Sequence, residues 1–337
     1  MNKISAVIIG ASGYTGAELL RLLLVHPHVE IKALVADSNA GKEITDIYPH
    51  FAVTKLPKLL KLDEVDFKGI DVAFCCLPHA TSQKIIKSLP KTVKVIDLAA
   101  DFRIQDIALY EKWYGEHFAK DIQPEAVYGL TEIHREKIKK ARIVACPGCY
   151  PTSILLPLLP LVAANAIDKD EIIADSKSGV TGAGRSLKQH LLFTEANEGV
   201  SAYSVTGHRH SAEVVEQLGT NFTFVPHLIP MNRGIISTIY VKLKTDLATA
   251  RKALEDKYKN EPFVKVLANG AIPATHSVRG TNYCLINIFE GQKPGNATIV
   301  SVIDNLNKGS SGQAVQNMNI MFNLPETTGL LETAIFP

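Results

Sequence analysis

The segment near the start of the chain constrains the fold more than any other. Residues 4–9 form a continuous apolar run, which is typical of a strand buried on both faces of a parallel sheet. Glycines at 10, 13 and 16 follow in the spacing G-x-x-G-x-x-G, and residues 17–25 have the pattern of a helix. In a strand–glycine turn–helix unit, backbone N–H groups and the helix N-terminus can hold a pyrophosphate. The segment predicts a dinucleotide-binding loop, and a tight turn without a ligand is the alternative. The loop residues are Gly10, Ala11, Ser12, Gly13, Tyr14, Thr15 and Gly16.

Strand-like and helix-like segments continue to alternate through the first half of the chain. Strands are predicted at residues 31–36, 71–77 and 93–98, and a helix runs through residue 89 after the turn that holds Pro78 and His79. This alternation indicates right-handed βαβ units in a doubly wound parallel sheet, with the ligand at the carboxyl ends of the strands. Arg103 follows the strand at 93–98, on that same edge, and is a candidate anion ligand or an ordinary surface arginine.

The end of the second predicted strand selects between the two nicotinamide cofactors. Asp37 there can accept a hydrogen bond from a ribose hydroxyl, which favours NAD, whereas Ser38 and Lys42 can hold a 2′-phosphate, which favours NADP. We predict NADPH, and the choice requires Asp37 to turn away from the phosphate.

Cys149 lies at a second predicted strand-to-helix turn. Residues 142–145 look like a short strand, Pro147 and Gly148 force a bend, and residues 152–164 form an apolar stretch that fits a helix. The N-terminus of that helix would lower the pKa of the Cys149 thiol and favour the nucleophilic thiolate. With Cys146 the pair also forms C-x-x-C, so a redox or zinc site and plain core packing are the alternatives.

Composition narrows the classes of function. The 337 residues suffice for two domains, and the formal net charge of +2 gives no sign of a nucleic-acid-binding surface. The five cysteines do not form a secreted disulfide framework. With no signal-peptide layout and no apolar run of transmembrane length, we expect a cytoplasmic protein that does not bind membranes.

Longer strands with fewer helices dominate the second half of the chain and predict a separate α+β domain with a mixed or antiparallel sheet. The glycine-rich loop 178–185 ends in Arg185 and suits an anionic group, or is only a flexible turn. His208 and His210 are two residues apart, so one can serve an active site while the other packs or meets solvent. His210 is expected near a helix start, where the dipole disfavours its charged form, so we predict that His208 forms the ion pair with the Cys149 thiolate. Residues 310–322 fit an amphipathic helix that returns to the first domain.

Six motifs in order along the chain resemble N-acetyl-γ-glutamyl-phosphate reductases, which share their fold with aspartate-semialdehyde dehydrogenases. The motifs are residues 10–16, 147–152, 178–185, 207–210, 226–234 and 305–309. The resemblance implies a Rossmann domain at residues 1–148 plus about 308–337, and a catalytic and oligomerisation domain at 149–307. The activity it implies is the NADPH-dependent reduction of N-acetyl-γ-glutamyl phosphate through a cysteine thioester, in arginine and ornithine biosynthesis. Alternatives are another acyl phosphate, as in aspartate-semialdehyde dehydrogenase, and a non-catalytic NADP-sensing regulator.

The resemblance also implies roles for individual residues. Cys149 is the nucleophile and His208 the acid–base group, and no metal is expected. The expected cofactor ligands beyond the glycine loop are Ser38, Lys42, Pro78, His79 and Asn305. The expected substrate ligands are Arg103, Ser178, Gly179, Arg185, His210 and Arg233. The partners implied are a small acyl-phosphate substrate and further copies of the chain, in a homodimer or homotetramer.

Overall fold

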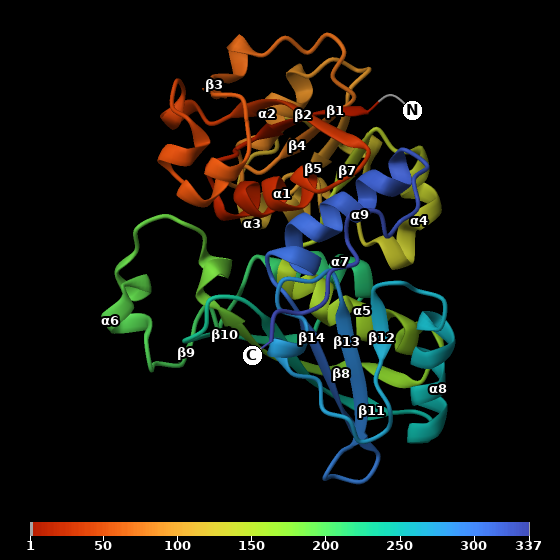
Figure 1. Ribbon diagram of the computed structural model, residues 1–337. Helices are drawn as coiled ribbons and strands as arrows, with labels where there is room; N and C mark the ends of the chain where they lie inside the picture. The colour runs from red at the N-terminus through yellow and green to blue at the C-terminus, as the bar shows by residue number, and fades with distance from the viewer. Residues whose placement is uncertain (1–2, 337) are drawn as a thin grey trace. The chain divides into compact units, whose positions relative to one another are not determined.

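The computed structural model describes residues 3–336, which divide into two compact units (Figure 1). Unit 1 comprises Met1–Pro147 and Ser310–Leu331, and unit 2 comprises Gly148–Gly309 and Glu332–Pro337. The chain therefore enters unit 2 at the turn before Cys149 and returns to unit 1 near residue 310.

Unit 1 is built on a parallel sheet of seven strands in the order β3-β2-β1-β4-β5-β7-β6. All its strand pairs are parallel, and the order reverses beside β1, as expected for a doubly wound sheet. The strands are β1 (Ile4–Ile9), β2 (Val29–Val35), β3 (Leu59–Leu60), β4 (Val72–Cys75), β5 (Lys94–Asp97), β6 (Ala126–Tyr128) and β7 (Ile143–Ala145). The helices are α1 (Tyr14–Leu24), α2 (Ser82–Ser88), α3 (Ile107–Tyr114), α4 (Thr131–Lys140) and α9 (Gly312–Met321).

Unit 2 is built on a mixed sheet of seven strands in the order β12-β13-β14-β11-β8-β10-β9. The β8–β10 and β12–β13 pairs are parallel and the others antiparallel. The strands are β8 (Ile167–Gly179), β9 (Ser201–Ala202), β10 (Thr223–Ile229), β11 (Ile235–Leu243), β12 (Val264–Val266), β13 (Cys284–Glu290) and β14 (Asn296–Ile303). The helices are α5 (Cys149–Ala163), α6 (Phe193–Ala196), α7 (His210–Leu218) and α8 (Leu247–Tyr258).

The two sheets confirm the predicted fold class, a doubly wound parallel sheet with a second α+β part. The apolar run 4–9 forms β1, an inner strand that is buried almost throughout, as expected for a parallel sheet whose two faces are both covered. Alternation along β11 instead buries every second side chain, which is the pattern of a sheet with one covered face.

The C-terminal helix α9 differs from the amphipathic helix that the pattern predicted, because all ten of its residues are buried. Its amides replace water with protein partners: Gln313 Nε2 and Asn317 Nδ2 donate to the carbonyl of Gly129 at 3.1 and 2.9 Å. Asn319 Oδ1 lies 3.0 Å from Nε2 of His26. The sequence pattern treats Gln and Asn as residues of an exposed face. In α9 they are buried because their amides keep hydrogen bonds to protein partners, so the prediction of an amphipathic helix was wrong.

Candidate active site

The nucleophile candidate Cys149 is the first residue of α5 and is partly exposed. β7 ends at Ala145, and Gly148 forms the N-cap of the helix with extended backbone. The buried carboxylate of Glu213 accepts the N–H of Gly148 at 2.8 Å, which fastens this turn to helix α7. The predicted strand-to-helix turn is thus present, and the thiol lies where the positive end of the helix dipole acts on it.

Two tyrosines of unit 2 interact electrostatically with the Cys149 thiol. The Tyr203 hydroxyl donates to the Tyr150 hydroxyl at 3.1 Å, and the Tyr150 hydroxyl in turn donates to the carbonyl of His227 at 3.2 Å. Burial raises the pKa of Tyr203 to about 12, and the charge of Cys149 pushes it in the same direction. The two phenols therefore remain protonated donors at neutral pH, beside the place where the thiolate would carry its charge.

His208 packs edge-on against Tyr150 and Tyr203, with ring centroids 5.7 and 5.6 Å apart. Its Nδ1 accepts the backbone N–H of His210 at 3.1 Å, which assigns the proton of the neutral ring to Nε2. Burial, with the charge of Arg209 as a second cause, lowers the pKa of His208 to about 4. The structure thus favours a neutral ring over the predicted imidazolium, because the site is desolvated. His210 is the first residue of α7, which confirms its predicted place.

The predicted substrate ligands of unit 2 lie on three segments. Ser178 and Gly179 end β8, and a Cβ on Gly179 would lie 2.7 Å from the carbonyl oxygens of Met231 and Asn232, so only glycine fits there. Arg185 is exposed at the end of the glycine-rich loop. Arg233 is partly buried, and its Nε lies 3.4 Å from the carboxylate of Asp304.

Asn305, which we predicted to bind the cofactor, spans two of these segments. Its Oδ1 accepts the N–H of Gly234 at 2.7 Å, and its Nδ2 donates to Oγ1 of Thr181 at 2.9 Å. The side chain thereby joins the turn after β10 to the loop after β8, a support role that the motif alone did not indicate.

The glycine loop of unit 1 contains glycines of two kinds. A Cβ on Gly10 would lie 2.2 Å from the carbonyl oxygen of Cys76, and one on Gly16 would lie 2.6 Å from that of Gly10, so chain packing requires both glycines. A Cβ on Gly13 would meet only the Gly10 carbonyl oxygen, at 3.7 Å. Gly13 is the N-cap of α1, so its lack of a side chain leaves room for a ligand at the helix N-terminus. The loop thus fits a dinucleotide pyrophosphate.

The residues after β2 form a short polar chain. Lys42 Nζ lies 3.2 Å from Asn39 Oδ1, and Asn39 Nδ2 lies 3.3 Å from the hydroxyl of Ser38. Asp37 Oδ1 accepts the backbone N–H of Leu62 at 3.3 Å, so this carboxylate faces the turn at residue 62.

Sequence reasoning missed the buried acids of unit 1. Asp101 accepts the N–H groups of Ala80 and Ser82 at 2.7 and 2.9 Å, which holds the turn that contains His79. Asp97 lies behind it and shares the Ser82 hydroxyl. Burial, helped by the charge of Asp101, raises the pKa of Asp97 to about 7. Arg103 is buried and donates to the carbonyl of Leu98 at 2.8 Å, rather than standing at the surface.

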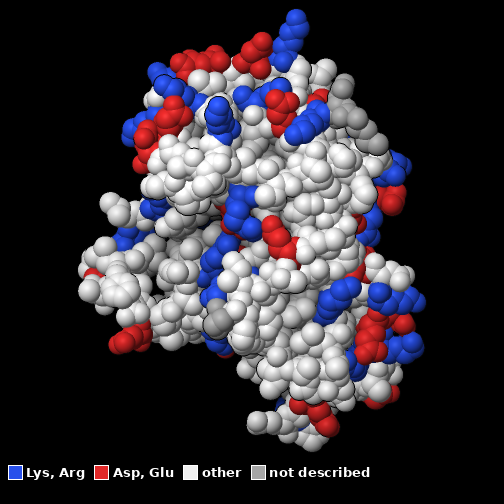
Figure 2. Space-filling view, viewed as in Figure 1, with Lys and Arg blue, Asp and Glu red and all other residues white. Residues whose placement is uncertain are grey.

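Charges of both signs are interspersed over the face shown in Figure 2, in keeping with the net charge of +2. All five cysteines are thiols and none forms a disulfide. Between residues 3 and 336, no helix has both the length and the apolar character needed to cross a bilayer.

Comparison with known proteins agrees with this geometry. The family model described as semialdehyde dehydrogenase, NAD binding domain, matches residues 5–141, and the one described as the dimerisation domain matches residues 149–305. N-acetyl-γ-glutamyl-phosphate reductase of Afipia carboxidovorans is 54% identical over 344 residues, covering 97% of each chain. The probable chloroplastic N-acetyl-γ-glutamyl-phosphate reductase of Arabidopsis thaliana is 53% identical over 339 residues, covering 98% of this chain and 84% of that protein.

The chain belongs to the N-acetyl-γ-glutamyl-phosphate reductase family. The resemblance predicted from the six motifs is therefore confirmed. Among solved structures, the aspartate-semialdehyde dehydrogenase of Candida albicans with NADP matches with a TM-score of 0.70 at 17% identity, over 95% of this chain and 99% of that one. At that identity the likeness concerns the fold, which the N-acetyl-γ-glutamyl-phosphate reductase family shares.

Proposed function

We propose that this protein reduces N-acetyl-γ-glutamyl phosphate to N-acetylglutamate 5-semialdehyde and phosphate with NADPH, in arginine and ornithine biosynthesis. The observation that carries the chemistry is Cys149 at the first position of α5, on a turn held by Glu213. Relatives about half identical over nearly the whole chain support the choice of substrate.

The proposed reaction uses Cys149 as a covalent catalyst. Its thiolate attacks the acyl carbon and forms a C–S bond, and the bond from carbon to the phosphate oxygen breaks, which leaves a thioester. When bound at the glycine loop, the cofactor supplies a hydride. The resulting thiohemiacetal oxyanion collapses, the C–S bond breaks, and the semialdehyde leaves with the thiolate restored.

We propose that His208 is the acid–base group and that its donor also stabilises the oxyanion. Because its Nδ1 accepts the His210 N–H, the neutral ring presents the Nε2 proton as a donor. A neutral donor in a desolvated site stabilises developing charge strongly. Arg103, Arg185, Arg233, Ser178, Gly179 and His210 remain the proposed substrate ligands, and either of Arg103 and Arg185 suits a carboxylate or a phosphate.

We propose NADPH rather than NADH as the cofactor. The carboxylate of Asp37 is engaged by Leu62, and Ser38 and Lys42 lie together with Asn39, an arrangement that suits a 2′-phosphate. The remaining proposed contacts are the 10–16 loop, Pro78, His79 and Asn305. In the Lys42→Ala variant we expect the ratio of kcat/KM for NADPH to that for NADH to fall by about ten- to a hundredfold, because a charge-assisted hydrogen bond contributes roughly 1.5–3 kcal/mol. A wild type that prefers NADH would contradict the assignment.

A homodimer formed through unit 2 is proposed for the quaternary structure. Helix α5 packs on one face of the sheet, against β8, β11 and β14. Ile173 and Tyr240 are paired across β8 and β11 and are 46% and 44% exposed. A charged residue at both positions should convert the dimer into a monomer in light scattering, and wild type that is monomeric at working concentration would exclude the proposal.

One assay tests the substrate. Phosphate-dependent reduction of NADP is measured with N-acetylglutamate semialdehyde and, in parallel, with aspartate semialdehyde. We expect activity with the acetylated compound, and activity with aspartate semialdehyde alone would assign another substrate. A regulator with an inert thiol would show neither activity, and its Cys149 would react with iodoacetamide only after denaturation. As for location, the thiols suit a reducing compartment, and we propose the cytoplasm.

A further inference from the structure

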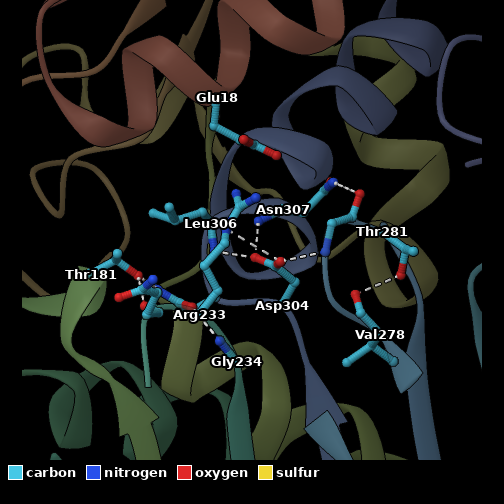
Figure 3. A network of polar contacts seen from close by, with 12 residues as sticks. Glu18, Thr181, Arg233, Gly234, Val278, Thr281, Asp304, Leu306 and Asn307 are labelled. Carbon is cyan, nitrogen blue, oxygen red and sulfur yellow. Dashed lines mark hydrogen bonds and ion pairs between the residues drawn. The ribbon is translucent and has the colours of Figure 1, made fainter. Parts of the chain in front are cut away.

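The turn that follows β14 is organised by one buried carboxylate, that of Asp304 (Figure 3). Its Oδ1 accepts the N–H groups of Leu306 and Asn307 at 2.8 and 3.0 Å. Its Oδ2 accepts the N–H of Gly280 at 2.7 Å and lies 3.4 Å from Nε of Arg233. A buried charge is tolerated when hydrogen bonds and an opposite charge satisfy it, and this one joins three separate segments of unit 2.

Two further hydrogen bonds, made by Asn307 and Gly309, stabilise the same turn. Asn307 Nδ2 donates to the carbonyl of Gly280 at 2.9 Å, which adds a second bond to that segment. The N–H of Gly309 donates to the Asp304 carbonyl at 3.0 Å and closes the turn. Residues 307–311 form a single π-helical turn, a rare geometry that is often found at functional sites.

Gly309 brings this turn against the nucleophile candidate. A Cβ on Gly309 would lie 2.8 Å from Cβ of Cys149 and 3.2 Å from its Cα. Real Cβ atoms do not approach that closely, so the backbone of Gly309 occupies the space immediately beside the Cys149 side chain. The Cys149 side chain is therefore bordered on one side by the Gly309 backbone, and Asp304 holds that backbone in position.

We propose that Asp304 is a positioning residue for Cys149: it holds residues 304–309 so that the Gly309 backbone packs on Cβ of Cys149 and fixes the direction of the thiol. The proposal rests on Cys149 being the nucleophile of the proposed function. Attack on an acyl carbon needs the sulfur aligned at near-contact distance, and a displacement of about 1 Å can cost about a hundredfold in rate. Packing against a fixed backbone limits such displacements.

Two variants test this role. Gly309→Ala pushes directly on Cys149, and Asp304→Asn keeps an oxygen for Leu306 and Asn307 while removing the charge that faces Arg233 and the acceptor for Gly280. Matched controls are Gly199→Ala, where the nearest atom to the new Cβ is 3.4 Å away, and Asp246→Asn, at the exposed N-cap of α8. The readouts are kcat, KM, Tm and the rate constant for alkylation of Cys149 by iodoacetamide, followed by mass spectrometry of its peptide.

We expect Gly309→Ala to lower kcat by about ten- to a hundredfold and Asp304→Asn by about tenfold, with KM changed less than about threefold. The alkylation rate constant should fall in both, and both controls should match the wild type. Folded variants with wild-type kcat and alkylation rate would overturn the proposal, even if their Tm is lower. If Gly309→Ala does not fold, Asp304→Asn decides alone. Activity in Cys149→Ser would instead refute the proposed function, and the alkylation rates would still measure the positioning of the thiol.

Discussion

The two strand–turn–helix units of this protein, β1 to α1 and β7 to α5, share a local layout but differ in how their turns are held. The first turn is shaped by glycines spaced three residues apart in one loop, and its backbone lies where we propose that a pyrophosphate binds. The second presents one thiol, and its supports are Glu213 and Gly309, 65 and 160 residues away in the chain. A site made of backbone groups can be formed by residues that are close in sequence. The orientation of the Cys149 side chain, in contrast, depends on residues that are distant in the chain.

The largest effect should come from removing the thiol. Cys149→Ser should lower kcat by about four orders of magnitude or more, because a serine hydroxyl is a far weaker nucleophile at neutral pH. Binding of NADPH, measured by fluorescence titration, should remain at the wild-type level, which separates the two turns. Cys146→Ser is the control, since that thiol is buried and the Nδ2 of Asn317 donates to it at 3.7 Å. Equal losses in the two variants would point to the C-x-x-C pair instead.

The next effect concerns the histidines of the second turn. His208→Asn should lower kcat by about two to four orders of magnitude, the usual range for a positioned acid–base group, and His210→Asn much less. Because the pKa of His208 is lowered to about 4, we expect the acid limb of kcat/KM that it causes to lie near pH 4. A reversed order of the two variants would exchange their roles.

The first turn should be sensitive in a different way. Gly13→Ala has room in the protein but places a methyl group where a pyrophosphate would approach, so KM for NADPH should rise by about ten- to a hundredfold with an unchanged Tm. Gly10→Ala should lower Tm instead, since its Cβ would meet the Cys76 carbonyl oxygen at 2.2 Å and its φ is +90°. Thermal unfolding beside cofactor titration distinguishes the two, and a fall in Tm for Gly13→Ala would show that this glycine too serves packing.

The sequence could predict the features that depend on neighbouring residues, but not those that depend on residues distant in the chain. Periodicity located β1 and the helix after Cys149, because each depends on residues within one segment. It could not find Glu213 or Asp304, since a carboxylate that accepts backbone N–H groups from distant turns leaves no local pattern. The ionisation of His208 was predicted wrongly for a related reason: desolvation depends on how Tyr150 and Tyr203 close around the ring.

The smallest expected effect concerns the stability of unit 1 and its dependence on the protonation of Asp97. The folded-state pKa of Asp97 is raised from its ordinary value of 3.8 to about 7, so the fold favours the protonated carboxyl. Its contribution to stability is complete below about pH 4 and is lost as the pH rises through 7. Asp97→Asn should therefore gain Tm relative to the wild type as the pH rises from 5 to 8, in calorimetry. A difference independent of pH would show that Asp97 does not titrate in this range.

Helix α9 has a consequence for how the chain is made. Gly129 and His26 obtain hydrogen-bond partners from Gln313, Asn317 and Asn319, which the ribosome adds nearly three hundred residues after His26. Domains usually fold in order as they emerge during synthesis. Here the N-terminal half keeps an incomplete interior until residue 319 has left the exit tunnel, whereas residues 148–309, the main part of the second unit, are synthesised earlier. The interior of the unit whose synthesis begins first is thus completed only after the main part of the other unit has been made, and its nascent form is a natural client for chaperones.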